Sequence, residues 1–162
     1  MGRAIADFFE KGHCAHPLLV RSEMFDDDEM PVPTLFRSEQ EMNALERHAL
    51  SLCRGRVLDV GAGAGCHSLA LQARGLEVTA VDISPLSVET MRRRGVHSAL
   101  CADFFADAVG EGFDTLLFLM NGIGLVGRVE RFVGGWRTNP FRLVGPALCL
   151  RGRRRSLRAR AG

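Results

Sequence analysis

The chain has 162 residues and a mass of 17.8 kDa, which is the size of a single domain. Hydrophobic residues make up 46% and charged residues 25% of it, an ordinary globular composition that excludes wholesale disorder and fibrous repeats. The formal net charge of +2 is unevenly distributed, because residues 131–162 carry nine arginines and no acid, whereas residues 1–130 carry twelve basic and nineteen acidic residues.

Neither a membrane span nor a secretory signal is predicted. The longest apolar stretch, Leu116 to Val126, is interrupted by polar and glycine residues and falls short of the ~20 residues that cross a bilayer. Asp7 and Glu10 lie where a signal peptide would be apolar, so we expect a cytoplasmic protein. The five cysteines are odd in number and form no Cys-x-x-Cys pair, which disfavours a disulfide framework or a zinc site, and no metal is expected.

Residues 1–52 are predicted to form a mostly helical lead segment. Ile5, Phe8 and Phe9 make one apolar stripe at helical spacing, and a second stripe lies within residues 42–52. Between them, Glu23 to Pro33 carries four consecutive acids and two prolines, which predict a solvated connecting loop.

From residue 53 to residue 130 the pattern alternates between strand and helix. Strands are predicted over 57–60, 77–81, 96–101 and 113–120, and helices over 66–74 and 85–94. Ser84 and Pro85 are the residue types that begin a helix, and Gly75 is typical of a helix end. The alternation predicts an α/β fold with a mostly parallel sheet and helices on both faces.

The glycine-rich loop that follows the first of these strands favours a nucleotide-type ligand. Glycines at 61, 63 and 65 let the backbone turn sharply and let a ligand approach the main chain, beside the free amides of the next helix. A dinucleotide fingerprint would need glycine at 66, where Cys66 stands, so a nicotinamide oxidoreductase is the weaker alternative. The phosphate-binding Gly-Lys-Ser/Thr loop is absent too, because Lys11 is the only lysine.

The same loop resembles that of the class I S-adenosylmethionine-dependent methyltransferases, and the resemblance extends over about Leu52 to Gly127. Asp59, Gly61, Gly63 and Gly65 match the pattern acid-x-Gly-x-Gly-x-Gly. The resemblance implies that these residues surround the methionine part of S-adenosylmethionine, the expected cofactor, in a Rossmann-like domain.

Four further positions match the family after the second and third strands. The resemblance implies that Asp82 holds the ribose hydroxyls, which suits a carboxylate because it only accepts hydrogen bonds. It also implies that Asp103 bonds the adenine amino group, with Phe104 packing on the adenine ring and Ile83 on the ribose or adenine face. The alternatives are polar residues at strand ends for Asp59 and Asp82 and a core position for Ile83.

Catalytic residues are not identified by the pattern. In this family the acceptor usually approaches near the end of the fourth strand, where Asn121 either lines the acceptor site or caps the strand. The sequence Asn-Gly-Ile-Gly at 121–124 replaces the Asn/Asp-Pro-Pro-Tyr/Phe of many amino-group methylases, which disfavours nucleic acid and glutamine acceptors. His67 is a candidate base or a local hydrogen-bond partner, and residues 35–37 fold over the pocket as a lid by family analogy.

The resemblance fades after Glu130, and the family's seven-stranded sheet is predicted to be incomplete, with about four strands. Residues 131–162 form an atypical arginine-rich tail, which a shifted reading frame would explain and sequencing of the source DNA across the junction would test. We therefore predict a methyltransferase, inactive if truncated, that acts on an unidentified acceptor, most simply a small molecule. The alternative is a nucleotide- or nucleic-acid-binding module that uses the basic tail. The oligomeric state is not indicated.

Overall fold

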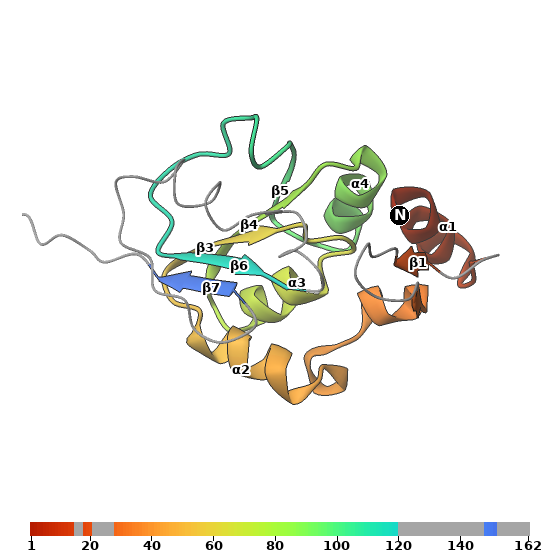
Figure 1. Cartoon of the computed structure of the whole chain (residues 1–162), viewed down its shortest axis with the longest axis horizontal. Coiled ribbons are helices and arrows are strands. Elements are labelled where there is room, and N and C mark those ends of the chain that lie inside the picture. Colours follow the sequence, from red (N-terminus) through yellow and green to blue (C-terminus); the bar gives the residue numbers. More distant parts are fainter. Residues whose placement is uncertain (15–17, 21–27, 120–147, 152–162) are drawn as a thin grey trace, which may run out of the picture.

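A five-stranded sheet forms the centre of the protein (Figure 1). The computed structural model describes residues 1–14, 18–20, 28–119 and 148–151. In spatial order the strands are β5 (Ser98–Cys101), β4 (Glu77–Asp82), β3 (Arg56–Val60), β6 (Thr115–Phe118) and β7 (Leu148–Arg151). The first four are mutually parallel, and β7 is antiparallel to β6.

The four parallel strands confirm the predicted α/β, Rossmann-like fold. Val57 pairs with Val78 of β4 on one side and with Thr115 of β6 on the other, so β3 is the central parallel strand. Both β3 and β6 are buried almost throughout, as expected of parallel strands covered on both faces. The predicted strands at 96–101 and 113–120 prove shorter within the described residues, at 98–101 and 115–118.

The edge strand β7 was not predicted from the sequence. Its backbone pairs with β6, with Leu117 opposite Cys149, and it therefore covers an edge that the four-strand prediction left open. The apolar run at 147–150 is short and stands next to an arginine-rich stretch, so it does not stand out as a strand. The frame-shift hypothesis for residues 131–162 is not tested by this pairing and stays a prediction.

Three helices cover one face of the sheet: α2 (Ala44–Leu52), α3 (Cys66–Ala73) and α4 (Pro85–Arg93). Their buried side chains pack against the sheet residues that point to this face, namely Val57, Val78, Ala80 and Leu117. Ser84 caps α4 by accepting a hydrogen bond from the Ser87 amide at 3.3 Å, and Pro85 occupies the first helical position as predicted.

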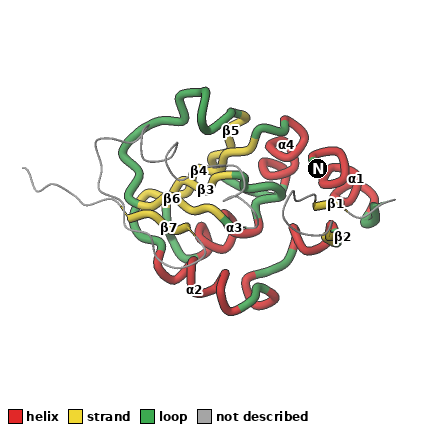
Figure 2. Tube along the Cα trace, in the orientation of Figure 1, coloured by secondary structure: helices red, strands yellow, loops and turns green. Residues whose placement is uncertain are grey.

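A loop, rather than a helix, covers the second face within the described residues. Residues 102–113 cross it and bury Phe104, Val109 and Phe113 against β3 and β6 (green in Figure 2). The Asp103 side chain accepts a hydrogen bond from the Phe105 amide at 2.9 Å, and Gly110 and Gly112 have positive φ angles. These local turns compete with a helix, so residues 102–113 cross this face as a loop.

Most described residues of the lead segment, residues 1–52, lie in helices. Besides α2 it contains α1 (Gly2–Lys11), the 3₁₀ helices η1 (Val32–Phe36) and η2 (Glu39–Glu41), and also a short antiparallel pair, β1 (Leu18–Val20) with β2 (Asp28–Met30). Strand β2 lies inside the stretch predicted to be a connecting loop. The acidic composition of this stretch predicted a loop. The strand forms by pairing with β1, which the local sequence does not indicate.

Candidate functional site

The glycine-rich loop lies at the carboxyl end of β3 and is fastened to the neighbouring strand. The amides of Gly61 and Ala62 both donate to the carbonyl of Val81, at 2.8 and 3.1 Å. Gly61, Gly63 and Gly65 all have positive φ, a conformation that other residues rarely adopt. This loop therefore sits at the edge of the sheet where parallel α/β folds bind ligands.

Asp82 joins the loop to the end of β4. One of its carboxylate oxygens accepts a hydrogen bond from the Gly63 amide and the other from the Ser84 amide, each at 2.9 Å. The residue is 4% exposed, and this burial raises the pKa of its carboxyl against the effect of the two amides. Each oxygen retains acceptor capacity, so the carboxylate can fix the loop and still receive hydroxyl protons of a ligand.

Asp59, the acid that precedes the glycines, is buried beneath the loop. Its carboxylate accepts a hydrogen bond of 2.6 Å from the Ser68 hydroxyl of α3. Burial raises the pKa of Asp59, which the charge of His67 and the Ser68 hydrogen bond oppose. Asp59 thus ties β3 to the first turn of α3, on either side of the loop.

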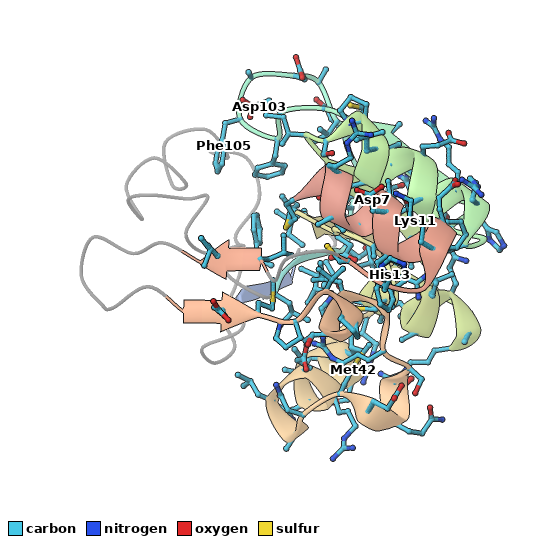
Figure 3. All side chains as sticks on the ribbon, turned by 90° about the vertical axis from the view of Figure 1, so that its right-hand side faces the viewer. Asp7, Lys11, His13, Met42, Asp103 and Phe105 are labelled. Carbon is cyan, nitrogen blue, oxygen red and sulfur yellow. The ribbon has the colours of Figure 1, made fainter. Side chains whose placement is uncertain are left out.

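Two exposed apolar side chains lie near Asp82 in sequence or in the sheet. Ile83, which follows Asp82, is 69% exposed. Asp82 pairs with Cys101 of β5, and the loop after β5 presents Asp103 and Phe105, which lie together at one end of the molecule in Figure 3. A ligand held by Asp82 would therefore have the apolar side chain of Ile83 directly after that carboxylate in the chain.

Two neighbouring phenylalanines, Phe104 and Phe105, differ in how far their rings are exposed. Phe104, the predicted adenine contact, is 9% exposed, and its ring makes edge-on contacts with Phe105 and Phe118 at centroid distances of 5.1 and 5.4 Å. Phe105 is 49% exposed and was not predicted. No signal in the sequence distinguishes Phe105 from Phe104, because the alternation of inward and outward side chains cannot be predicted through a turn.

His67, the candidate base, belongs to a buried charged cluster. Its Nε2 lies 2.9 Å from Oε1 of Glu46 in α2, and the guanidinium of Arg37 bonds the same oxygen. Burial acts to lower the pKa of His67, but hydrogen bonds with Cys66 and Glu46 outweigh it and raise the pKa to about 10. Burial likewise opposes the lowered pKa of Glu46, about 2, which hydrogen bonds from His67 and the Asn43 amide and the Arg37 charge produce.

This cluster predicts a pH dependence of stability. Because the folded pKa of His67 lies above its ordinary value of 6.5, the stabilisation is complete below about pH 6.5 and is lost as the pH rises through about 10. The contribution of Glu46 is present above its ordinary pKa of 4.5 and is lost as the pH falls through about 2. We expect the thermal unfolding midpoint to fall by several degrees between pH 7 and 10.

His67→Leu is the control for that alkaline decrease. It removes the titrating imidazole and leaves the Arg37–Glu46 ion pair in place. The variant should show a clearly shallower decline of the unfolding midpoint over the same pH range. An equal decline in both proteins would contradict the assignment of the effect to His67.

The lead segment covers the glycine loop. The end atoms of Ile5 from α1 and Leu35 from η1 would lie 4.0 Å from a Cβ at Gly63, and both side chains are buried with Ala64. Arg94 donates to the carbonyl of Phe36 at 3.2 Å and also to the carbonyl of Ala64. Leu35 and Phe36 therefore lie close to the loop, and the lid formed by residues 35–37 stays a prediction.

Some predicted features fall outside the described residues or remain without a counterpart there. Asn121 lies outside them, and so do residues 122–124. Among the described residues, no group of three or more His, Cys, Asp or Glu side chains is arranged to hold a metal ion. No helix in the described ranges has the length and apolar character needed to cross a membrane.

Comparison with known proteins identifies a methyltransferase domain in the chain. The family model described as "Methyltransferase domain" matches residues 57–128. A crystal structure of an S-adenosylmethionine-dependent methyltransferase from Bacteroides fragilis, in complex with S-adenosylhomocysteine, is 51% identical with a TM-score of 0.74, and the match covers 84% of this chain and 56% of that one. The chain therefore contains a methyltransferase domain, which confirms its resemblance to the class I S-adenosylmethionine-dependent methyltransferases.

Relatives of this methyltransferase domain act on different acceptors. The ubiquinone biosynthesis O-methyltransferase of Xylella fastidiosa (strain M23) is 40% identical over 60 residues, which are 37% of this chain and 24% of the relative. The release factor glutamine methyltransferase of Chlorobaculum tepidum is 35% identical over 115 residues, 59% of this chain and 38% of the relative. The chain thus spans about a quarter to two fifths of their length, and family membership does not fix the acceptor.

Proposed function

We propose that the chain binds S-adenosylmethionine at the carboxyl ends of β3 and β4 and that the protein transfers its methyl group to a small-molecule acceptor. The observation that carries the cofactor proposal is the geometry of Asp82. This nearly buried carboxylate holds the glycine loop through Gly63 and stands next to the exposed side chain of Ile83. A carboxylate that can accept hydrogen bonds from both hydroxyls of a ribose, next to an apolar side chain, suits a nucleoside.

The residues present fit the parts of that cofactor. Asp82 would accept the ribose hydroxyls, and the main chain of residues 61–65 would lie along the methionine part, with the amides of the first turn of α3 favouring its carboxylate. Ile83 and Phe105 would pack on the adenine, with Asp103 near its amino group. The sulfonium group of the bound cofactor supplies an electrophilic methyl group.

The protein's own contribution is then mainly to position the donor and acceptor. An imidazole must be neutral to act as a general base, and the raised pKa of His67 favours its protonated form near pH 7. We therefore assign no base to His67. Asn121 stays a predicted acceptor-site residue.

The acceptor class rests on the sequence at 121–124. Asn-Gly-Ile-Gly there replaces the Asn/Asp-Pro-Pro-Tyr/Phe of many amino-group methylases, which favours a small-molecule acceptor over nucleic acid. The nucleic-acid alternative rests on the tail of residues 131–162. It would be supported by a nucleic-acid affinity that falls steeply with salt and disappears when residues 151–160 are deleted.

Calorimetric titration of the full chain with S-adenosylhomocysteine tests the cofactor proposal, with NAD as the matched control. We expect saturable binding of one S-adenosylhomocysteine per chain and no heat of binding with NAD. Binding of NAD alone would contradict the proposal and favour the oxidoreductase alternative. No binding of either compound by a chain with a cooperative thermal transition would contradict both.

Replacing Phe105 or Phe104 by alanine should have different effects. Phe105→Ala should weaken S-adenosylhomocysteine binding about fivefold to tenfold, as expected for the loss of a stacking contact of ~1–1.5 kcal/mol, with little change in stability because the ring is half exposed. Phe104→Ala should instead cost about 3–5 kcal/mol of unfolding free energy, since it removes a buried ring. Urea unfolding and calorimetry on both variants measure the two effects. The reverse pattern would return the adenine contact to Phe104.

A further inference from the structure

A buried charged cluster joins the lead segment to the helix that follows the glycine loop. Arg37 comes from the end of η1, Glu46 from the first turn of α2 and His67 from the first turn of α3, and their side chains are 9%, 5% and 6% exposed. Oε1 of Glu46 receives both Arg37 and His67. Its Oε2 accepts a hydrogen bond of 3.1 Å from the Asn43 amide, so both oxygens of the carboxylate are in use.

The cluster adjoins the proposed cofactor site through His67. His67 is two residues beyond Gly65, the N-cap of α3, and its charge acts on the carboxylate of Asp59 under the loop. From the other side, Leu35 of the lead segment lies next to Gly63. Glu46 therefore links Arg37 of the lead segment to His67, which follows the glycine loop.

Charge distinguishes this contact from ordinary packing. Two cationic groups share one carboxylate in the interior, where each unpaired charge would be costly. Besides Glu46, the titratable groups that act on His67 are the adjacent Cys66 and Asp59 of β3. A buried pair of this kind often fails to stabilise a fold more than apolar side chains would, so its position beside a ligand loop points to a role at that site.

We propose that Glu46 is a positioning residue for the cofactor site: through His67 it fixes the first turn of α3, and with it the glycine loop, in the geometry that binds the cofactor. The inference rests on the proposed function and deepens it. Glu46 and His67 touch neither the cofactor nor the acceptor in this account. Their effect should appear in cofactor affinity at unchanged overall fold.

A second ion pair between the same two parts of the chain offers a matched control. Glu39 of η2 receives hydrogen bonds of 3.2 and 2.5 Å from the guanidinium of Arg74, which follows the last turn of α3. Both side chains are about one third exposed. Glu39→Gln thus breaks a link between the lead segment and α3 at the surface, and Glu46→Gln weakens the buried link with the same change of atoms.

The test is calorimetric titration of S-adenosylhomocysteine into wild type, Glu46→Gln and Glu39→Gln, each first shown to unfold cooperatively. We expect Glu46→Gln to weaken binding at least about tenfold, at the upper part of the range for residues that act through others. Glu39→Gln should stay within about twofold of wild type. Histidine NMR signals report the charge directly: His67 should remain protonated at pH 8 in wild type and become neutral there in Glu46→Gln, a change that loss of packing alone does not cause.

The outcomes separate the two levels of the proposal. Wild-type affinity in a folded Glu46→Gln variant, or equal weakening in Glu39→Gln, would overturn the positioning role and leave the proposed function intact. Absence of binding by the wild type would overturn the proposed function and this inference with it. If Glu46→Gln does not fold, His67→Leu takes its place, because the Arg37–Glu46 pair remains, and wild-type affinity in that variant would overturn the inference equally.

Discussion

Asp82→Ala should lower the affinity for S-adenosylhomocysteine by at least about 100-fold. The substitution removes the acceptor of two backbone amides, those of Gly63 and Ser84, together with the proposed acceptor of the ribose hydroxyls. Hydrogen bonds to a charged group contribute about 1.5–3 kcal/mol each, and 2.7 kcal/mol corresponds to roughly 100-fold. Calorimetric titration measures the loss, and Asp82→Asn repeats the test with a nearly unchanged side-chain volume.

The control for Asp82 is another aspartate that binds a backbone amide in the same sheet. Asp114 precedes β6 at the opposite, amino-terminal end of the strands, and it accepts a hydrogen bond of 2.9 Å from the Arg56 amide. Asp114→Ala should lower stability without changing the dissociation constant. Equal loss of affinity in the two variants would show that Asp82 acts through general stability and not through the site.

Gly65→Ala should be among the most destabilising single-methyl substitutions in the described part of the chain. Gly65 has a φ of 81°, and a Cβ there would lie 2.9 Å from Val96 Cγ2 and 3.0 Å from Met91 Cγ. The left-handed conformation costs about 1–2 kcal/mol for alanine, and forcing an extra methyl into a packed core costs about 1–3 kcal/mol more. Urea unfolding should therefore show a loss of roughly 2–5 kcal/mol.

Gly75→Ala separates the two components of that loss. Gly75 has a similar φ of 78°, but a Cβ at this position would meet nothing within 4 Å. Its substitution should cost only the conformational part, about 1–2 kcal/mol. If both variants lose the same free energy, the close packing of Gly65 against α4 and Val96 is not what makes glycine necessary at the start of α3.

The parts of the site that the sequence predicted are those that a short stretch of chain encodes by itself. The glycines of the loop, Asp82 at the end of a β-branched run, and the Ser84–Pro85 helix start all depend on neighbours within a few positions. Their places in the structure follow from the strand–loop–helix pattern. The parallel pairing of β3 with β4 and of β4 with β5 follows in the same way, because the helices α3 and α4 connect these strands.

The features that the sequence did not predict depend on distant contacts. Glu46 looks like an ordinary helix-start acid, and its second role requires His67, which only folding brings within 2.9 Å. Phe104 and Phe105 differ by one position, and only the turn at Asp103 decides which ring enters the core. The pairing of β1 with β2, and of β7 with β6, likewise joins segments whose local composition indicated loops or an irregular tail.

Amide hydrogen exchange with and without S-adenosylhomocysteine tests most directly whether the cofactor site lies where we place it. We predict that the ligand slows amide exchange in residues 59–67 and 82–84, and that Asp82→Ala abolishes this protection. The peptide that contains Gly112 and Asp114, at the opposite end of the sheet, should exchange at the same rate in both states. Protection confined to other segments, or none at saturating ligand, would contradict the assignment of the site.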